Sequence, residues 1–76
     1  FNSSTIIKYE IPKYSDVKIK LYNVGGKEIQ TLINEKQSAG KYEILFDASQ
    51  LASGIYFYAL LINDINIKTN KFIILK

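Results

Sequence analysis

The side chains that most often carry enzyme chemistry are scarce in this sequence. Histidine and cysteine are both absent. General acid or base work near neutral pH would therefore need a carboxylate or a lysine whose pKa is shifted by burial, and no pattern here predicts such burial. No histidine is present to activate the serines, and no nucleophile-elbow motif surrounds Ser3, Ser4, Ser15, Ser38, Ser49 or Ser53. We predict that the chain has no catalytic residue and is not an enzyme.

Three aspartates and a glycine pair are the remaining candidates for a metal or cofactor site. Asp16, Asp47 and Asp64 lie in predicted turns, where a carboxylate commonly accepts hydrogen bonds from nearby backbone N–H groups. They form no spaced cluster of oxygen ligands of the kind that calcium requires. Gly25 and Gly26 lack the strand, helix and lysine arrangement of a phosphate-binding loop, so we interpret them as a hairpin turn. We expect no metal and no cofactor.

The charge is modest and entirely of one basic type. The net charge is +3, and all 10 basic residues are lysines. Without arginine the chain lacks the planar guanidinium group that binds phosphate or guanine through two hydrogen bonds. Nucleic acid is therefore a poor candidate partner. Five lysines of the predicted strands mostly alternate with apolar residues, namely Lys8, Lys18, Lys20, Lys68 and Lys71. This alternation is typical of a solvated outer sheet face.

The elements that must position these side chains are predicted to be strands. Isoleucine and tyrosine are frequent, and both favour pleated, half-buried surfaces. Strict alternation of apolar and polar residues indicates two strands before residue 23, the first ending at Pro12, and another after residue 40. Their expected inward residues are Ile7, Tyr9, Ile11, Val17, Ile19, Leu21, Tyr42, Ile44 and Phe46.

Other segments are less regular. A hairpin at residues 23–26 is expected to lead into a further strand. The side chains of that strand that face the core are either Ile29, Thr31 and Ile33 or, if the opposite face turns inward, Leu32. A polar loop is predicted over residues 34–40, and a sheet crossing with a possible short helical turn over 47–54. We expect a strand over residues 55–62, a turn over 63–66, and one strand or a bent pair over 67–76.

Short strands separated by frequent turn signals predict an all-β fold. We expect an antiparallel β-sandwich of six to seven strands with Greek-key connections, forming one domain over residues 1–76. No apolar run is long enough to span a bilayer, so membrane insertion is not expected. The absence of methionine predicts a piece of a longer product.

The segment from Leu51 to Tyr56 has a mechanical interpretation. In sandwich domains, a tyrosine that enters a strand just after a loop can direct its hydroxyl back to the backbone of that loop. Gly54 would allow the close approach, so we predict a structural corner formed by Leu51, Gly54 and Tyr56. The alternative is that Tyr56 is simply an apolar core residue.

Two late segments, residues 56–62 and 72–75, are apolar on both predicted faces. A two-sheet sandwich buries only one face of each sheet, so the other face is expected to expose apolar side chains. Phe57, Leu61, Ile73 and Leu75 are therefore predicted to form an outward patch, and such patches often mark docking surfaces.

Several stretches along the whole chain resemble one known family. They are the opening Phe1–Pro12, the segment Val17–Ile29, the Ala39-Gly40 turn, Phe46-Asp47-Ala48, Gly54-Ile55-Tyr56, and the lysine-framed end Lys71–Lys76. Together they resemble the type A C-terminal sorting domains of the type IX secretion system. Ser3 departs from the proline that is usual there, which affects only the first turn.

The resemblance implies an immunoglobulin-like sandwich attached to a larger secreted protein of the Bacteroidetes type. The expected partners are the type IX secretion machinery, a surface sortase that removes the domain or exchanges it for an anchor, and the parent cargo domain. The expected path leads through the periplasm to the cell surface or the extracellular space. The export recognition segment is expected to be Lys71, Phe72, Ile73, Ile74, Leu75 and Lys76.

Two other functions remain open from the sequence. Related sandwich modules, such as that of the flagellar hook-capping protein, share the hairpin and corner pattern without an export role, so the domain could be a structural module. Such a module would pack on a parent enzyme or adhesin, or associate with copies of itself through an apolar edge strand. An ancillary carbohydrate binder that stacks sugars on Tyr14, Tyr22 or Tyr58 is a weaker alternative, because no polar cluster accompanies these rings.

Overall fold

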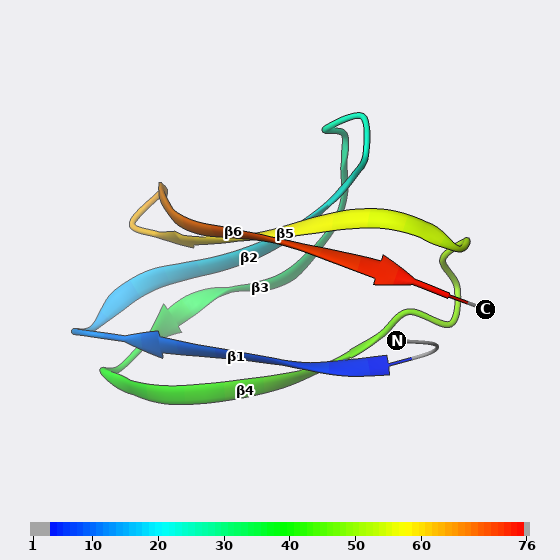
Figure 1. Ribbon diagram of the computed structural model, residues 1–76. Coiled ribbons are helices and arrows are strands. Elements are labelled where there is room, and N and C mark those ends of the chain that lie inside the picture. The colour runs from blue at the N-terminus through cyan, green and yellow to red at the C-terminus, as the bar shows by residue number, and fades with distance from the viewer. Residues whose placement is uncertain (1–3, 76) are drawn as a thin grey trace.

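The computed structural model describes residues 4–75, which form six antiparallel strands and no helix (Figure 1). The strands are β1 (Ser4–Ile11), β2 (Ser15–Asn23), β3 (Glu28–Gln37), β4 (Gly40–Asp47), β5 (Gly54–Ile62) and β6 (Ile65–Ile74). β1 pairs with β4 in a two-stranded sheet, and the other strands form a four-stranded sheet in the order β3-β2-β5-β6. The predicted all-β antiparallel sandwich is confirmed.

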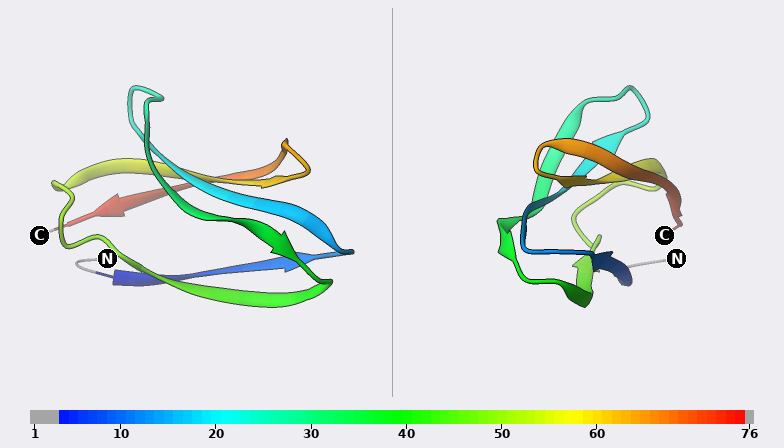
Figure 2. Two further views of the ribbon diagram at one scale, coloured as in Figure 1. Left: turned by 180° about the vertical axis from the view of Figure 1, so that it is seen from behind. Right: turned by 90° about the vertical axis from the view of Figure 1, so that its left-hand side faces the viewer.

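The chain passes repeatedly between the two sheets. It crosses after β1, after β3 and after β4, while the β2–β3 and β5–β6 connections are hairpins within one sheet (Figure 2). As a result β2 and β5 are neighbours although β3 and β4 separate them in sequence. This non-consecutive pairing is the arrangement that Greek-key connections produce.

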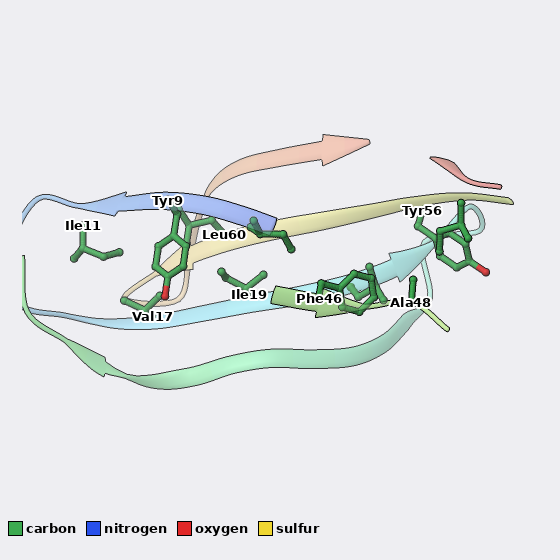
Figure 3. Close-up of a cluster of buried hydrophobic side chains, with 11 residues drawn as sticks. Tyr9, Ile11, Val17, Ile19, Phe46, Ala48, Tyr56 and Leu60 are labelled. Atoms are coloured by element: carbon green, nitrogen blue, oxygen red, sulfur yellow. The ribbon is translucent and has the colours of Figure 1, made fainter. Parts of the chain in front are cut away.

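The core lies between the sheets and follows the predicted alternation. Val17, Ile19 and Leu21 are each 0% exposed and extend from β2 toward the two-stranded sheet. Burying a large aliphatic side chain stabilises a fold by about 1.5–3 kcal/mol. Figure 3 shows side chains from both sheets meeting in this core, which contains Ile7, Tyr9, Ile11, Val17, Ile19, Leu21, Phe46, Ala48, Tyr56, Leu60 and Ile74.

The predicted polar loop over residues 34–40 is wrong. Residues 34–37 belong to β3, and only Ser38 and Ala39 separate β3 from β4. In the ladder with β2, Asn34 is opposite Lys18 and Gln37 is opposite Ser15. β3 is an edge strand held mainly by backbone pairing, so its side chains did not have to be apolar.

The register of β3 and the start of β6 also differ from simple alternation. The β2–β3 ladder shifts register after Ile19 and again after Leu21, which leaves both Leu32 and Ile33 packed against the core. The turn between β5 and β6 is shorter than predicted, because Ile65 already pairs with Ile62. β6 is a single strand within the described residues.

The segment between β4 and β5 contains a turn and no helical residues. The backbone N–H of Leu51 donates to the carbonyl of Ala48 at 3.0 Å. Asp47 accepts a hydrogen bond from the backbone N–H of Ser49 at 2.9 Å, which is the turn role predicted for it. Asp16, by contrast, lies inside β2 rather than in a turn.

Candidate functional site

The last strand divides its side chains between the core and the surface. Phe72 lies on the inner face, where its ring centroid is 5.8 Å from that of Tyr56 and 6.0 Å from that of Phe46. Ile74 is 0% exposed. Within the predicted export segment, these two residues therefore hold β6 against the rest of the sandwich.

The residues that alternate with them are exposed. Lys71 lies opposite Phe57 of β5 in the ladder, and Ile73 lies opposite Ile55. Ile73 is 45% exposed, and Leu75, which follows β6, is 66% exposed. We call Lys71, Ile73 and Leu75 the outer row. Lys76, the last predicted member of the export segment, lies outside the described residues.

Apolar side chains on the outer face of β5 extend this surface. Phe57 and Leu61 alternate with the inward Tyr56, Leu60 and Ile62, so they point away from the core. Both are partly exposed. The structure thus places Phe57, Leu61 and Ile73 on the same outer face of the four-stranded sheet. Tyr22, opposite Phe57 on β2, borders this area.

The corner predicted at the start of β5 has a specific hydrogen bond. The Tyr56 hydroxyl donates to the backbone carbonyl of Ala52 at 2.7 Å. Gly54 has a φ of 156°, while a Cβ added there would meet the Tyr56 ring at an ordinary 3.9 Å. Glycine is therefore favoured at this position by its backbone conformation and not by a lack of space. Leu51 packs against the core from the same loop.

Sequence reasoning missed a second corner of the same kind. At the start of β4, the Tyr42 hydroxyl donates to the backbone carbonyl of Ser38. The Tyr42 ring also stacks on Tyr9, with ring centroids 5.4 Å apart. The signal was present, because Ser38–Tyr42 and Ala52–Tyr56 share the pattern of a glycine at the third position and a tyrosine at the fifth. Each corner lies where the chain enters a new sheet.

The glycine pair lies in the β2–β3 hairpin. The Asn23 side-chain Oδ1 accepts hydrogen bonds from the backbone N–H groups of Gly25 and Lys27, both at 3.0 Å. Gly26 has a φ of 85°, a left-handed conformation that favours glycine. These residues form a turn that is held by its own hydrogen bonds.

Several charged side chains of the described residues pair with one another at the surface. Within residues 4–75, no three carboxylates lie close enough together to hold a metal ion. Lys18 Nζ lies 2.6 Å from Asp64 Oδ1, and this hydrogen bond and charge lower the pKa of Asp64 and raise that of Lys18. Asp16 Oδ1 forms a separate ion pair with Lys36 Nζ at 3.2 Å. The first contact joins β2 to the turn between β5 and β6, and the second joins β2 to β3.

The three tyrosines considered for sugar stacking are not equivalent. Tyr14 is 64% exposed, with the Lys36 ammonium 5.9 Å from its ring centroid. Tyr58 packs against the core and lies 6.0 Å from the Phe72 ring. Tyr22 is partly exposed on a different strand. The three rings therefore do not form one stacking platform.

The comparison with known families agrees with the sequence resemblance. A family model described as the secretion system C-terminal sorting domain matches residues 1–76, the whole chain. No curated protein and no solved structure matches the chain. The match does not favour the alternative of a purely structural module, and domains of this family act in general as signals rather than as catalysts. The chain therefore belongs to the secretion system C-terminal sorting domain family and is a sorting signal of the type IX secretion system.

Proposed function

We propose that the type IX machinery binds this sorting signal through the outer row, Lys71, Ile73 and Leu75. The observation that carries the proposal is that the side chains of β6 alternate between the core and the surface. Ile74 is 0% exposed, and Phe72 is partly buried against the core, so both serve mainly to hold β6 in place. The outer row is exposed on the folded domain and combines two apolar side chains with one positive charge.

The apolar area beside the outer row supports this assignment. Phe57 and Leu61 lie on the same outer sheet face and are partly exposed. A contiguous apolar area on a small domain is a common docking feature. A lysine at its border would steer an acidic receptor and fix its orientation more than it would add affinity.

The remaining parts of the proposed path concern the whole protein. A type IX sorting signal directs its parent cargo to the cell surface or the extracellular space. We infer that the domain is one unit of a longer product, passes through the periplasm, and performs no catalysis itself. We also infer that a surface sortase then acts on it, either releasing the cargo or exchanging the domain for an anchor. Self-association through β6 is a second candidate role, because this strand forms an edge of its sheet.

The test is the location of a fluorescent reporter that carries a periplasmic leader and residues 1–76. It is expressed in a type IX host and in the same host without the translocon. In the host, the unchanged domain should deliver the reporter to the surface or the medium, and in the deletion strain the reporter should stay in the periplasm.

A triple variant, Lys71→Ala with Ile73→Ser and Leu75→Ser, tests the outer row itself. We expect its reporter to stay in the periplasm of the host while the purified domain remains folded. The matched control is Val24→Ser with Leu45→Ser, two exposed apolar residues outside β5, β6 and the groove between β1 and β6, 71% and 72% exposed. Export of the triple variant at the level of the control would show that the outer row is not the recognition surface.

A further inference from the structure

A groove runs between β1 and β6 along one side of the sandwich. Two adjoining hollows of about 170 and 190 Å³ form it, and they share Ile7, Tyr58 and Asn70 in their walls. Together they extend along residues 5–10 of β1 and residues 67–72 of β6. In Figure 1 both strands run along the near side of the molecule, and Figure 2 (left), seen from behind, shows both on the far side.

Each wall of the groove is the edge of a sheet. Among the described residues, β1 pairs only with β4 and β6 pairs only with β5. The two-stranded sheet is also narrower than the four-stranded sheet that it covers. An edge strand presents backbone N–H and C=O groups that can pair with a further strand. The edge of β1 therefore has room for one more strand opposite the inner face of β6.

The floor of the groove is the hydrophobic core. Ile7, Ile19 and Leu60 line it and are 2%, 0% and 8% exposed. Asn70 lies between the two hollows, and within residues 4–75 its side chain makes no hydrogen bond. Such a site offers apolar contacts for alternate side chains of an extended chain and one amide for its backbone.

The rims of the groove are positively charged. Lys8, Lys68 and Lys71 line the hollows and are exposed, and none of them takes part in the ion pairs found among the described residues. Glu10 is the only carboxylate in these walls. The hollow on the opposite side, between β3 and β4, is lined by Asp47 and no lysine. Charge complementarity therefore favours an acidic occupant of the β1–β6 groove.

We propose that the β1–β6 groove binds one extended peptide strand in which apolar and acidic residues alternate. The strand pairs with the edge of β1 and makes the two-stranded sheet three-stranded. Its apolar side chains enter the two hollows over Ile7 and Leu60, and its alternating carboxylates face solvent at the rim, near Lys8 and Lys68. Of the outer row, only Lys71 also lines the groove, whereas Ile73 and Leu75 do not, so the two proposed surfaces meet at one residue.

The binding test uses the complete 76-residue chain and a synthetic nonapeptide that alternates aspartate and valine, with blocked ends and a fluorescent label. We expect saturable binding by fluorescence anisotropy, weaker at high salt, with NMR shift changes at Ile7 and Asn70. A peptide that alternates lysine and valine should not bind, nor should one with the aspartates and valines in separate blocks. Absence of binding by the first peptide, or equal binding by the block peptide, would overturn the proposal.

Variants of the chain locate the site. Lys8→Glu with Lys68→Glu should weaken binding about tenfold, because two charge contacts of modest strength are reversed. The control, Lys13→Glu with Lys27→Glu, makes the same charge change away from the groove and should leave affinity within about twofold. Equal loss in both double variants would mean that only net charge matters and would refute the site.

A steric variant gives an independent readout. Asn70→Phe should fill the space between the hollows and abolish binding, while Thr31→Phe, in the hollow between β3 and β4, should leave it unchanged. Sedimentation of the chain without peptide provides a last check. A dimer whose groove residues shift in NMR on dilution would show a second copy as the occupant and overturn the acidic peptide. Because these variants leave Lys71, Ile73 and Leu75 intact, failure here is distinguishable from failure of the export assay.

Discussion

Two consecutive isoleucines of β6 should differ sharply in their contribution to stability. Ile74 is 0% exposed and belongs to the core, whereas Ile73 is 45% exposed on the outer face. We consider the substitutions Ile74→Ala and Ile73→Ala, which remove the same atoms from neighbouring positions. The comparison tests which face of β6 points into the core, and the assignment of the outer row depends on that orientation.

The structure sets the expected magnitudes. Ile→Ala removes three carbons, worth about 2.4 kcal/mol of transfer free energy when fully buried, and the cavity left behind brings the cost of Ile74→Ala to about 3–4 kcal/mol. Ile73 is about half exposed and leaves no closed cavity, so its replacement should cost about 1 kcal/mol. A domain of this length has a free energy of unfolding of about 4–11 kcal/mol. Ile74→Ala should therefore remove about a third or more of the stability.

Urea unfolding followed by circular dichroism measures both costs, because a small single domain is expected to unfold in one cooperative step. Equal costs at the two positions would refute the reasoning. A larger cost at Ile73 would mean that β6 is paired one residue out of the described register, since a slip by one residue exchanges the two faces of a strand.

Three further predictions concern other elements of the sandwich. Tyr56→Phe should lower the free energy of unfolding by about 1 kcal/mol and the melting temperature by about 4–8 °C, because the bond to Ala52 is lost while the exposed carbonyl can bind water. Gly26→Ala should cost about 1 kcal/mol in the same urea assay, because φ is 85° there. Lys18→Gln should raise the pKa of Asp64 in an NMR titration. A carboxylate whose pKa is lowered in the folded state stabilises the fold fully above its unfolded pKa of about 3.9. This stabilisation is lost as the pH falls through the folded-state pKa. In Lys18→Gln, the free energy of unfolding should therefore depend less on pH below about pH 4.

Each of these predictions has a matched control in the chain. Tyr14 is exposed, so Tyr14→Phe should change stability little. Gly25 does not have a positive φ, so Gly25→Ala should be tolerated better than the change at Gly26. Lys27→Gln removes a turn lysine that is not paired with Asp64 and should leave the Asp64 pKa unchanged. If a control matched its partner variant, the assigned contact would not be the cause.

Alternation predicted the strands that bury one face and expose the other. In β2, Val17 and Leu21 point into the core and Lys18 and Lys20 point outward, so a period of two residues leaves no ambiguity. β3 was predicted less well because it is a mostly exposed edge strand with two register shifts. Backbone pairing with β2 determines where it ends, and no side-chain pattern records that.

The candidate sites were predictable to different degrees. The apolar end of the chain was visible, but a segment that is apolar on both sides does not show which face turns inward. That choice follows from the register with β5, which the Asn63-Asp64 turn and the shift at Leu60/Leu61 determine. The turn itself has φ values of 52° and 64°, typical of a tight two-residue hairpin. The β1–β6 groove depends on how the two sheets are placed, so only the structure reveals it.

The position of β5 also has a consequence for aggregation. The nine residues Gly54–Ile62 contain no charge and no proline, and they are rich in aromatic and branched side chains. Exposed in an unfolded chain, such a segment readily forms cross-β fibrils. In the folded domain β5 lies between β2 and β6, so both of its edges are already paired, and lysines stand on each neighbouring strand, as in Lys18 and Lys68. Folding therefore pairs both edges of the segment that could otherwise join another copy of itself.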